Sequence, residues 1–109
     1  MDPNRAVDGW SVLADDTRRA IVIRLAEGPL AVGRLAEGLP VTRSAVSQHL
    51  KILKAARLVT DHAAGTRRLY AIDPRGIETL RAWLDGFWDQ TLTAFKEAAE
   101  REAGKERKP

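Results

Sequence analysis

Side chains that can hydrogen-bond to nucleic-acid bases recur along one side of the segment 43–56. If this segment is an α-helix, each residue turns about 100° from the one before, and the polar side chains fall within an arc of roughly 140°. They are Arg43, Ser44, Ser47, Gln48 and Lys51. Arginine can bond guanine bidentately, glutamine can bond adenine, and serine can bond a base edge or a phosphate. The chemistry is that of a helix in a major groove, although any solvated helix surface could show the same pattern.

The opposite side of this helix is predicted to pack into a core. Val46, Leu50 and Leu53 occupy a separate arc of about 100°. His49 borders that arc, so we interpret it first as a packed or backbone-bonded residue and second as a contact to a phosphate or base. His62 has no partner suggested by spacing and is expected on the surface.

The residues before this helix predict a helix-turn-helix. Thr42 is placed to cap the helix, because its hydroxyl can accept hydrogen bonds from first-turn N–H groups that have no helical partner. A shorter helix is predicted over 32–37, and residues 39–41 form the turn between the two. In this arrangement the second helix enters the major groove.

A β-hairpin with a basic tip is predicted next. Strands over 58–60 and 68–72 flank a turn of small residues. Thr66, Arg67 and Arg68 lie at or beside the tip, where arginines could contact phosphates or the minor groove and add affinity with little base information. Side chains alternate along a strand, so Arg67, nearer the tip, is the preferred contact. The alternative is a pair of solvated charges without a partner.

Further helices are predicted on both sides of this unit, over 5–13, 18–27 and from 74 to 99 or beyond. The apolar stripe of the first consists of Val7, Trp10 and Leu13. The last carries aromatic side chains on more than one side, which favours a dimer interface, whereas Trp10 could also be explained by core packing. The residues predicted for the interface are Trp10, Leu80, Trp83, Leu84, Phe87, Trp88 and Phe95.

Length and composition predict one domain, and the elements described above make it mainly helical with a small β-hairpin. A chain of 109 residues, 44% hydrophobic and 30% charged, has material for a single core. We expect one domain over 1–100 and a charged, frayed tail over 101–109. The net charge of +3 is unevenly spread: residues 42–75 hold seven arginines and lysines against two aspartates. Such a basic block favours a polyanionic partner, here double-stranded DNA, over a basic surface with no partner.

Several classes of site are excluded or disfavoured. The chain has no cysteine, so disulfides, thiolate metal sites and cysteine nucleophiles are excluded. Asp85 and Asp89 are spaced so that both could bind one metal ion, but no histidine accompanies them. No metal or other cofactor is therefore expected. No nucleophile and base pair up in the sequence and no glycine-rich phosphate loop occurs, so an enzyme is not expected. With no apolar stretch of membrane-spanning length, a cytoplasmic protein is expected.

Four segments together resemble the ArsR/SmtB family of bacterial repressors. They are 13–19 (LADDTRR), 41–53 (VTRSAVSQHLKIL), Leu58-Val59 and 65–70 (GTRRLY). The similarity covers about Trp10 to Phe95. It implies a winged helix-turn-helix dimer, packed through its first and last helices across a two-fold axis, that binds a pseudo-palindromic operator and represses transcription.

The chain departs from the family pattern at two places. Many members have glycine where this chain has Arg57, at a helix end that often needs a left-handed residue. The family's metal sites use a cysteine pair before the recognition helix, or histidine and carboxylate ligands on the last helix, and neither set occurs here. We therefore expect zinc, cadmium and arsenite to leave DNA binding unchanged.

Three hypotheses remain open on sequence alone. The first is a metal-independent repressor whose release signal, if one exists, is unknown. The second is a repressor that senses an organic ligand among Trp10, Trp83, Phe87 and Trp88. The third is an architectural DNA-binding protein without sequence preference, which would bind operator and random DNA equally.

Overall fold

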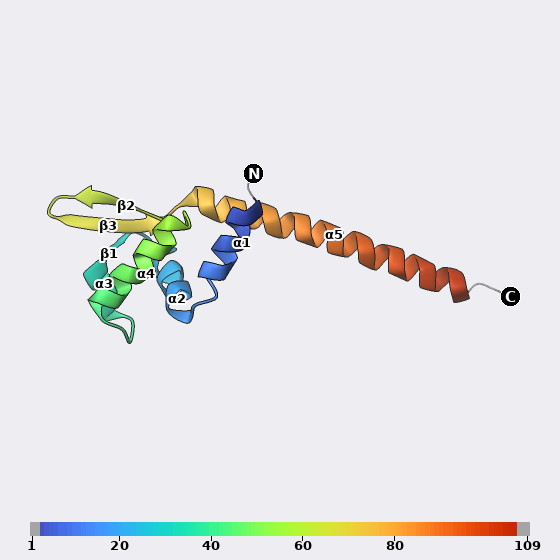
Figure 1. The fold of residues 1–109 in the computed structure, drawn as a ribbon, viewed down its shortest axis with the longest axis horizontal. Coiled ribbons are helices and arrows are strands. Elements are labelled where there is room, and N and C mark those ends of the chain that lie inside the picture. Colours follow the sequence, from blue (N-terminus) through green and yellow to red (C-terminus); the bar gives the residue numbers. More distant parts are fainter. Residues whose placement is uncertain (1–2, 107–109) are drawn as a thin grey trace.

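The computed structural model describes residues 3–106 of the chain, with side chains described for 8–105. These residues form a mainly helical protein with a small antiparallel sheet (Figure 1). The elements are α1 (Pro3–Val12), α2 (Asp16–Leu25), β1 (Leu30–Ala31), α3 (Val32–Glu37), α4 (Arg43–Ala55), β2 (Val59–Ala64), β3 (Arg67–Ile72) and α5 (Pro74–Glu106). The predicted fold class is confirmed.

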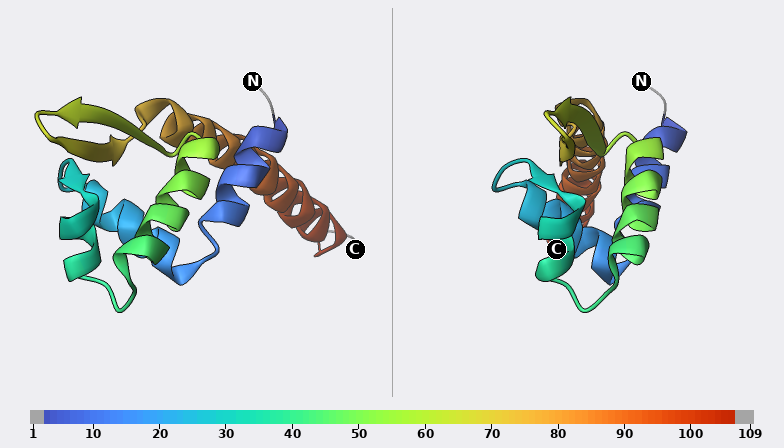
Figure 2. Two further views of the ribbon diagram at one scale, coloured as in Figure 1. Left: turned by 60° about the vertical axis from the view of Figure 1, so that its left-hand side comes forward. Right: turned by 90° about the vertical axis from the view of Figure 1, so that its left-hand side faces the viewer.

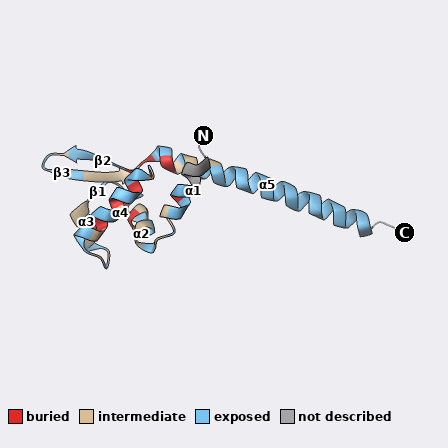
Figure 3. Ribbon diagram, in the orientation of Figure 1, coloured by how far each residue is buried: buried red, intermediate tan, exposed pale blue. Residues whose placement is uncertain are grey.

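The core lies where α2, α3 and α4 meet the base of the sheet. Its buried residues are Ile21, Leu25, Leu35, Val46, Leu50, Leu53, Leu58, Val59 and Leu80. Along α4 the buried positions recur every three or four residues, as a helix with one apolar face requires (Figure 3). The apolar arc predicted for this helix is thus confirmed, and its burial fixes which side of α4 remains in solvent.

Side-chain caps set where α2 and α4 begin. The Asp15 carboxylate accepts a hydrogen bond from the Arg18 backbone N–H at 3.0 Å. That bond, with nearby positive charge, holds the pKa of Asp15 below its ordinary value. The Thr42 hydroxyl accepts from the Ala45 N–H, also at 3.0 Å, as predicted. Because a capped end frays less, the first turn of α4 is held in a defined place beside α3.

The sheet has three antiparallel strands in the order β1-β3-β2. The β2–β3 hairpin projects from the helices (Figure 2). It turns at Gly65, whose φ of 65° is left-handed. Both of its strands are longer than predicted. Strand β1 was not predicted at all, and it pairs Leu30 with Tyr70 and Ala31 with Leu69. This pairing ties the start of α3 to the hairpin.

Helix α4 ends in a left-handed residue that is not glycine. Arg57 has a φ of 61°. Its N–H donates to the Lys54 carbonyl at 3.0 Å, and the Leu58 N–H donates to the Leu53 carbonyl at 3.0 Å, which together form a Schellman ending. The conformation that usually favours glycine is therefore present, and arginine adopts it at a cost of about 1 kcal/mol.

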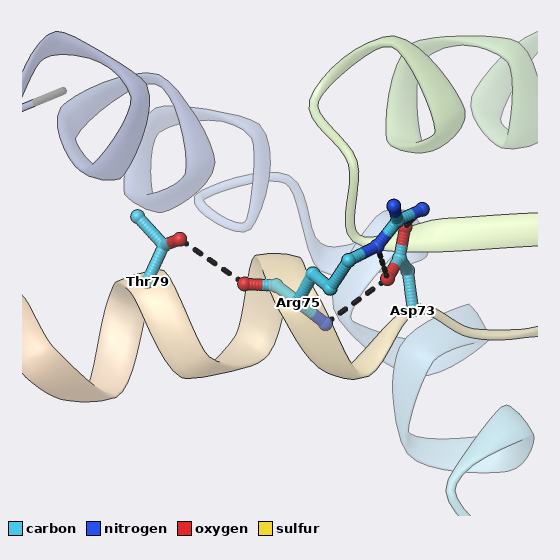
Figure 4. Close-up of polar contacts among 3 residues, drawn as sticks. All are labelled: Asp73, Arg75 and Thr79. Atoms are coloured by element: carbon cyan, nitrogen blue, oxygen red, sulfur yellow. Dashed lines mark hydrogen bonds and ion pairs between the residues drawn. The ribbon is translucent and has the colours of Figure 1, made fainter. Parts of the chain in front are cut away.

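Helix α5 begins against this same turn. Asp73 is buried, and its N–H donates to the Leu58 carbonyl at 3.0 Å. Its carboxylate accepts from the Arg75 backbone N–H at 3.0 Å (Figure 4). Burial opposes ionisation of this carboxyl, but the hydrogen bonds from Arg75 outweigh it and hold the pKa of Asp73 below its ordinary value. At Gly76 the helix passes so close to Arg57 that a Cβ would lie 1.7 Å from the Arg57 carbonyl oxygen.

Helix α1 packs on the first turns of α5. A Cβ at Gly9 would lie 2.8 Å from the Leu80 Cδ2 atom, so glycine permits the close approach of the two helices. Leu80 is only 6% exposed and belongs to the core of one protomer, which corrects its predicted place in a dimer interface. Of the stripe predicted for α1, the Val7 side chain lies outside the described residues.

Most of α5 projects away from the rest of the protein. The molecule measures 77 × 29 × 22 Å, and every residue from Trp83 to Lys105 is exposed (Figures 1 and 3). The tail predicted to fray from residue 101 is instead helical as far as Glu106, and 107–109 lie outside the described residues. Glutamate, lysine, arginine and alanine are good helix formers, which explains why the helix continues past Gly104. No described helix is both long enough and apolar enough to cross a membrane.

Candidate nucleic-acid interface

The solvent side of α4 carries the polar set that the sequence predicts. Its exposed members are Thr42, Arg43, Ser44, Ser47, Gln48 and Lys51. The buried side of the same helix lies in the core, so rotation of α4 about its axis is fixed. The structure thus presents hydroxyl, amide, ammonium and guanidinium groups together on one solvent-facing surface, and these groups suit hydrogen bonding to base edges and phosphates.

His49 does not belong to this exposed surface. It is half-buried, and its Nδ1 atom lies 3.3 Å from Nη1 of Arg18 on α2. A guanidinium can only donate, so Nδ1 accepts this hydrogen bond and a neutral ring carries its proton on Nε2. Arg18 is held in turn, because its Nε–H donates to the Val12 carbonyl at 2.7 Å. His49 therefore connects α4 to α2, which agrees with its first interpretation and does not support a contact to DNA.

The hairpin tip carries its two arginines in different environments. Arg68 donates to Asp61 on the neighbouring strand at 3.1 Å, and Lys54 of α4 contacts the same carboxylate at 2.6 Å. The hydrogen bond from Lys54 is the main reason that the pKa of Asp61 lies below its ordinary value. Arg67 forms no ion pair with any residue described in the structure, and Thr66 beside it is exposed. The two arginines therefore lie in different environments, and Arg67 is the freer of the two.

A groove of about 430 Å³ separates the hairpin tip from α3 and the first turn of α4. Its charged lining residues are Arg34, Glu37, Arg43, Arg67 and Arg68, and Thr66 and Tyr70 also line it. Arg34 was not among the predicted site residues, and it lies 3.4 Å from Glu37. No sequence signal marks Arg34 because strand β1, which brings α3 to the hairpin, has only two residues. Four arginines from three elements meet in this groove against one glutamate.

Arg43 points into this groove. Its guanidinium lies over Gly33 of α3, where a Cβ would come 3.3 Å from Nη2 and 3.5 Å from Cζ. Within the described part of the chain it forms no ion pair. Arg43 is therefore associated with α3 and the hairpin tip more than with the middle of α4.

A second exposed surface, the aromatic face, lies on α1 and α5. Trp10 meets Trp83 edge to face at a centroid distance of 6.1 Å, and Trp83 stacks on Phe87 at 5.5 Å with an interplanar angle of 7°. Trp88 continues the contact with Phe87 at 6.3 Å. Each of these rings is more than a third exposed, as are Leu84 and Phe95. Such a contiguous apolar surface is typical of a protein interface.

Metal-ligating groups do not gather in the described part of the chain. Within it, no three histidine, aspartate or glutamate side chains lie close enough to share an ion. Asp89 and Glu97 line the same shallow surface of α5, but both are exposed and no nitrogen ligand joins them.

Similarities to known proteins agree with this geometry. The family described as "Bacterial regulatory protein, arsR family" matches residues 15–61. The chain is 60% identical over 100 residues to the HTH-type transcriptional regulator Rv2034 of Mycobacterium tuberculosis, a match that covers 92% of this chain and 91% of that protein. It is 30% identical over 78 residues to the transcriptional repressor SdpR of Bacillus subtilis, covering 72% of this chain and 87% of SdpR.

A solved structure extends the similarity to three dimensions. The solution NMR structure of the homodimeric winged helix-turn-helix DNA-binding domain of Mb0332 from Mycobacterium bovis has a TM-score of 0.64 and 27% identity, and the match covers 82% of each chain. The matched family is one of transcriptional regulators, which are not enzymes. The α3–turn–α4 unit followed by the β2–β3 hairpin is accordingly a winged helix-turn-helix, with the hairpin as its wing. This protein belongs to the ArsR family of bacterial transcriptional regulators and carries its DNA-binding domain.

Proposed function

We propose that this protein is a homodimeric repressor that binds a pseudo-palindromic operator, with α4 of each protomer in a major groove. The two faces of α4 carry this proposal. One face is locked in the core and the other presents exposed Ser44, Ser47, Gln48 and Lys51. These side chains offer the donors and acceptors that discriminate base pairs, and the wing beside them supplies Arg67 for the backbone.

The aromatic face supports a dimer. Isolated exposed apolar residues are common, but the rings in contact from Trp10 through Trp83 to Phe87 form one continuous surface. The similar winged helix-turn-helix domain of Mb0332 from Mycobacterium bovis is homodimeric. A two-fold dimer of this chain would present two α4 helices related by the same symmetry, so its DNA site would be a pseudo-palindrome.

The proposed repressor does not sense metals through the family's sites. The chain has no cysteine, and α5 has no histidine to join Asp85 or Asp89. Borderline and soft metals such as zinc and cadmium prefer nitrogen and sulfur ligands, which are missing from α5. Repression would follow from occupancy, because a dimer bound across a promoter blocks access of the transcription machinery.

The direct test is sequence preference. DNA fragments retained by the purified full-length protein are sequenced, and the affinity for the recovered site is compared with that for a scrambled duplex of equal length at physiological salt. We expect the recovered site to bind at least roughly 1,000-fold more tightly, and to take up two protomers per site. A ratio near one would instead identify an architectural DNA-binding protein and overturn the proposal.

A further inference from the structure

We infer that the groove between α3, the first turn of α4 and the wing is a binding site for phosphates of the DNA backbone, and that Arg43 grips the backbone there without reading a base. This inference deepens the proposed function and rests on it. It moves Arg43 from the base-reading set to the backbone-binding set and adds Arg34, which the sequence does not single out.

The charge of the groove indicates an anionic occupant. Arg34, Arg43, Arg67 and Arg68 converge on it from three elements, against Glu37 alone. Arg68 already shares Asp61 with Lys54, and Arg34 lies within 3.4 Å of Glu37. Arg43 and Arg67 therefore both line the groove with no carboxylate partner among the described residues. A phosphate between them would accept charge-assisted hydrogen bonds and relieve the repulsion of like charges.

The direction of Arg43 separates it from the other polar residues of α4. In a helix the Cα–Cβ bond tilts toward the N-terminus, so a side chain in the first turn points back toward whatever precedes the helix. Here that neighbour is α3, and Gly33 has no side chain to hold the guanidinium away. Ser47, Gln48 and Lys51 emerge further along the helix and do not line the groove. They keep the base-reading role that Arg43 loses.

The lining of the groove fits a passing nucleic-acid strand better than an enclosed small molecule. Arg34, Arg43, Thr66 and Arg67 are all exposed, and the groove is open to solvent beside the exposed face of α4. A strand whose bases face α4 could therefore run its phosphates along the groove. Planar guanidiniums bind phosphate bidentately, and Thr66 adds a hydroxyl donor at the rim.

The decisive variants are Arg43→Ala and Arg43→Lys, each measured on the operator and on a scrambled duplex at several salt concentrations. Lysine keeps a positive charge that can still hold a phosphate, although it lacks the bidentate fork of arginine. A weaker phosphate contact affects both DNAs equally, whereas a lost contact to guanine affects the operator alone. We expect Arg43→Ala to weaken both DNAs by the same factor and to lower the slope of log K against log salt by about two units per dimer. Arg43→Lys should keep the ratio between the two DNAs unchanged.

Arg34→Ala should behave like Arg43→Ala, since Arg34 lines the same groove. Arg101→Ala is the matched control, because it removes one exposed arginine from the projecting end of α5. It should leave affinity and the salt slope as in the wild type. Thermal unfolding of each variant, recorded alongside, is expected to match the wild type because these side chains lie outside the core.

Each result separates this inference from the proposed function. If Arg43→Lys loses about 5- to 150-fold on the operator and little on scrambled DNA, Arg43 reads a base and the inference is overturned while the repressor stands. If the wild type itself does not prefer the operator, the proposed function fails first. A titration with inorganic phosphate or a 5′-mononucleotide distinguishes the source of phosphate: tight binding that releases the operator would make the groove an effector pocket and also overturn the inference.

Discussion

Gly76→Ala is expected to destabilise the fold by at least about 3 kcal/mol, at the upper end of what overpacking a core costs. A Cβ at this position would lie 1.7 Å from the Arg57 carbonyl oxygen and 2.6 Å from its carbon, and both are backbone atoms. The turn cannot move aside easily. It is fixed by the Leu58 N–H bond to Leu53 and by the Asp73 N–H bond to Leu58. The midpoint of thermal unfolding, measured at equal protomer concentration, should fall by about 12 °C or more.

Gly104→Ala is the control for this change. It lies in the same helix, but a Cβ there meets no atom within 4 Å. Alanine should therefore be neutral or stabilise the helix by up to about 1 kcal/mol, because alanine is the better helix former. If Gly76→Ala unfolded at the same temperature as Gly104→Ala, the packing of α5 against the end of α4 would be wrong.

Phe87→Ala is expected to weaken dimerisation by about thirtyfold or more. Phe87 stacks on Trp83 and contacts Trp88, and it is 47% exposed in one protomer. Aromatic residues at the centre of a protein interface often cost about 2 kcal/mol or more on truncation. Sedimentation over a series of micromolar concentrations should show a dimer for the wild type and a shifted equilibrium for Phe87→Ala.

Ile23→Ala is the control for this variant. Ile23 is 66% exposed and lies on α2. Its replacement by alanine therefore removes an exposed apolar side chain that is not part of the aromatic face. Its association should equal that of the wild type. A wild type that sediments as a monomer would contradict the dimer, and equal loss in Ile23→Ala and Phe87→Ala would contradict the place assigned to its interface.

The helical part of the fold could be predicted because its signals are local. The cap at Thr42 and the buried series Val46, Leu50 and Leu53 depend only on neighbours within one helix. Strand β1 could not be predicted in this way. It has two residues, and what makes it a strand is its pairing with Leu69 and Tyr70, far along the chain. The end of α4 at Arg57 was predictable in part. The sequence indicated that the helix ends there, but arginine is an unusual residue for the left-handed conformation that it adopts.

In the candidate site, too, features set by local signals could be predicted and features set by long-range contacts could not. The exposed face of α4 followed from periodicity alone, and the proximity of Arg67 to the hairpin tip followed from the turn of small residues just before it. The position of Leu80 in the core depends on how α1 crosses α5 at Gly9, which no single-helix pattern contains. The groove that joins Arg34 to Arg43 and Arg67 likewise depends on β1 holding α3 against the hairpin. Sequence patterns missed or misplaced the residues whose surroundings depend on contacts between segments far apart in the chain.

The most direct test of the account compares Gln48→Ala with Arg67→Ala on the operator and on scrambled DNA over a range of salt. Both side chains are exposed, so neither change should disturb the core. If α4 reads the bases, Gln48→Ala loses about 1 to 3 kcal/mol on the operator and little on scrambled DNA. Arg67→Ala then weakens both DNAs by similar factors and lowers the slope of log K against log salt by about two units per dimer. Loss of affinity in the same pattern for both variants on both DNAs would contradict the assignment of α4 as the sequence-reading helix.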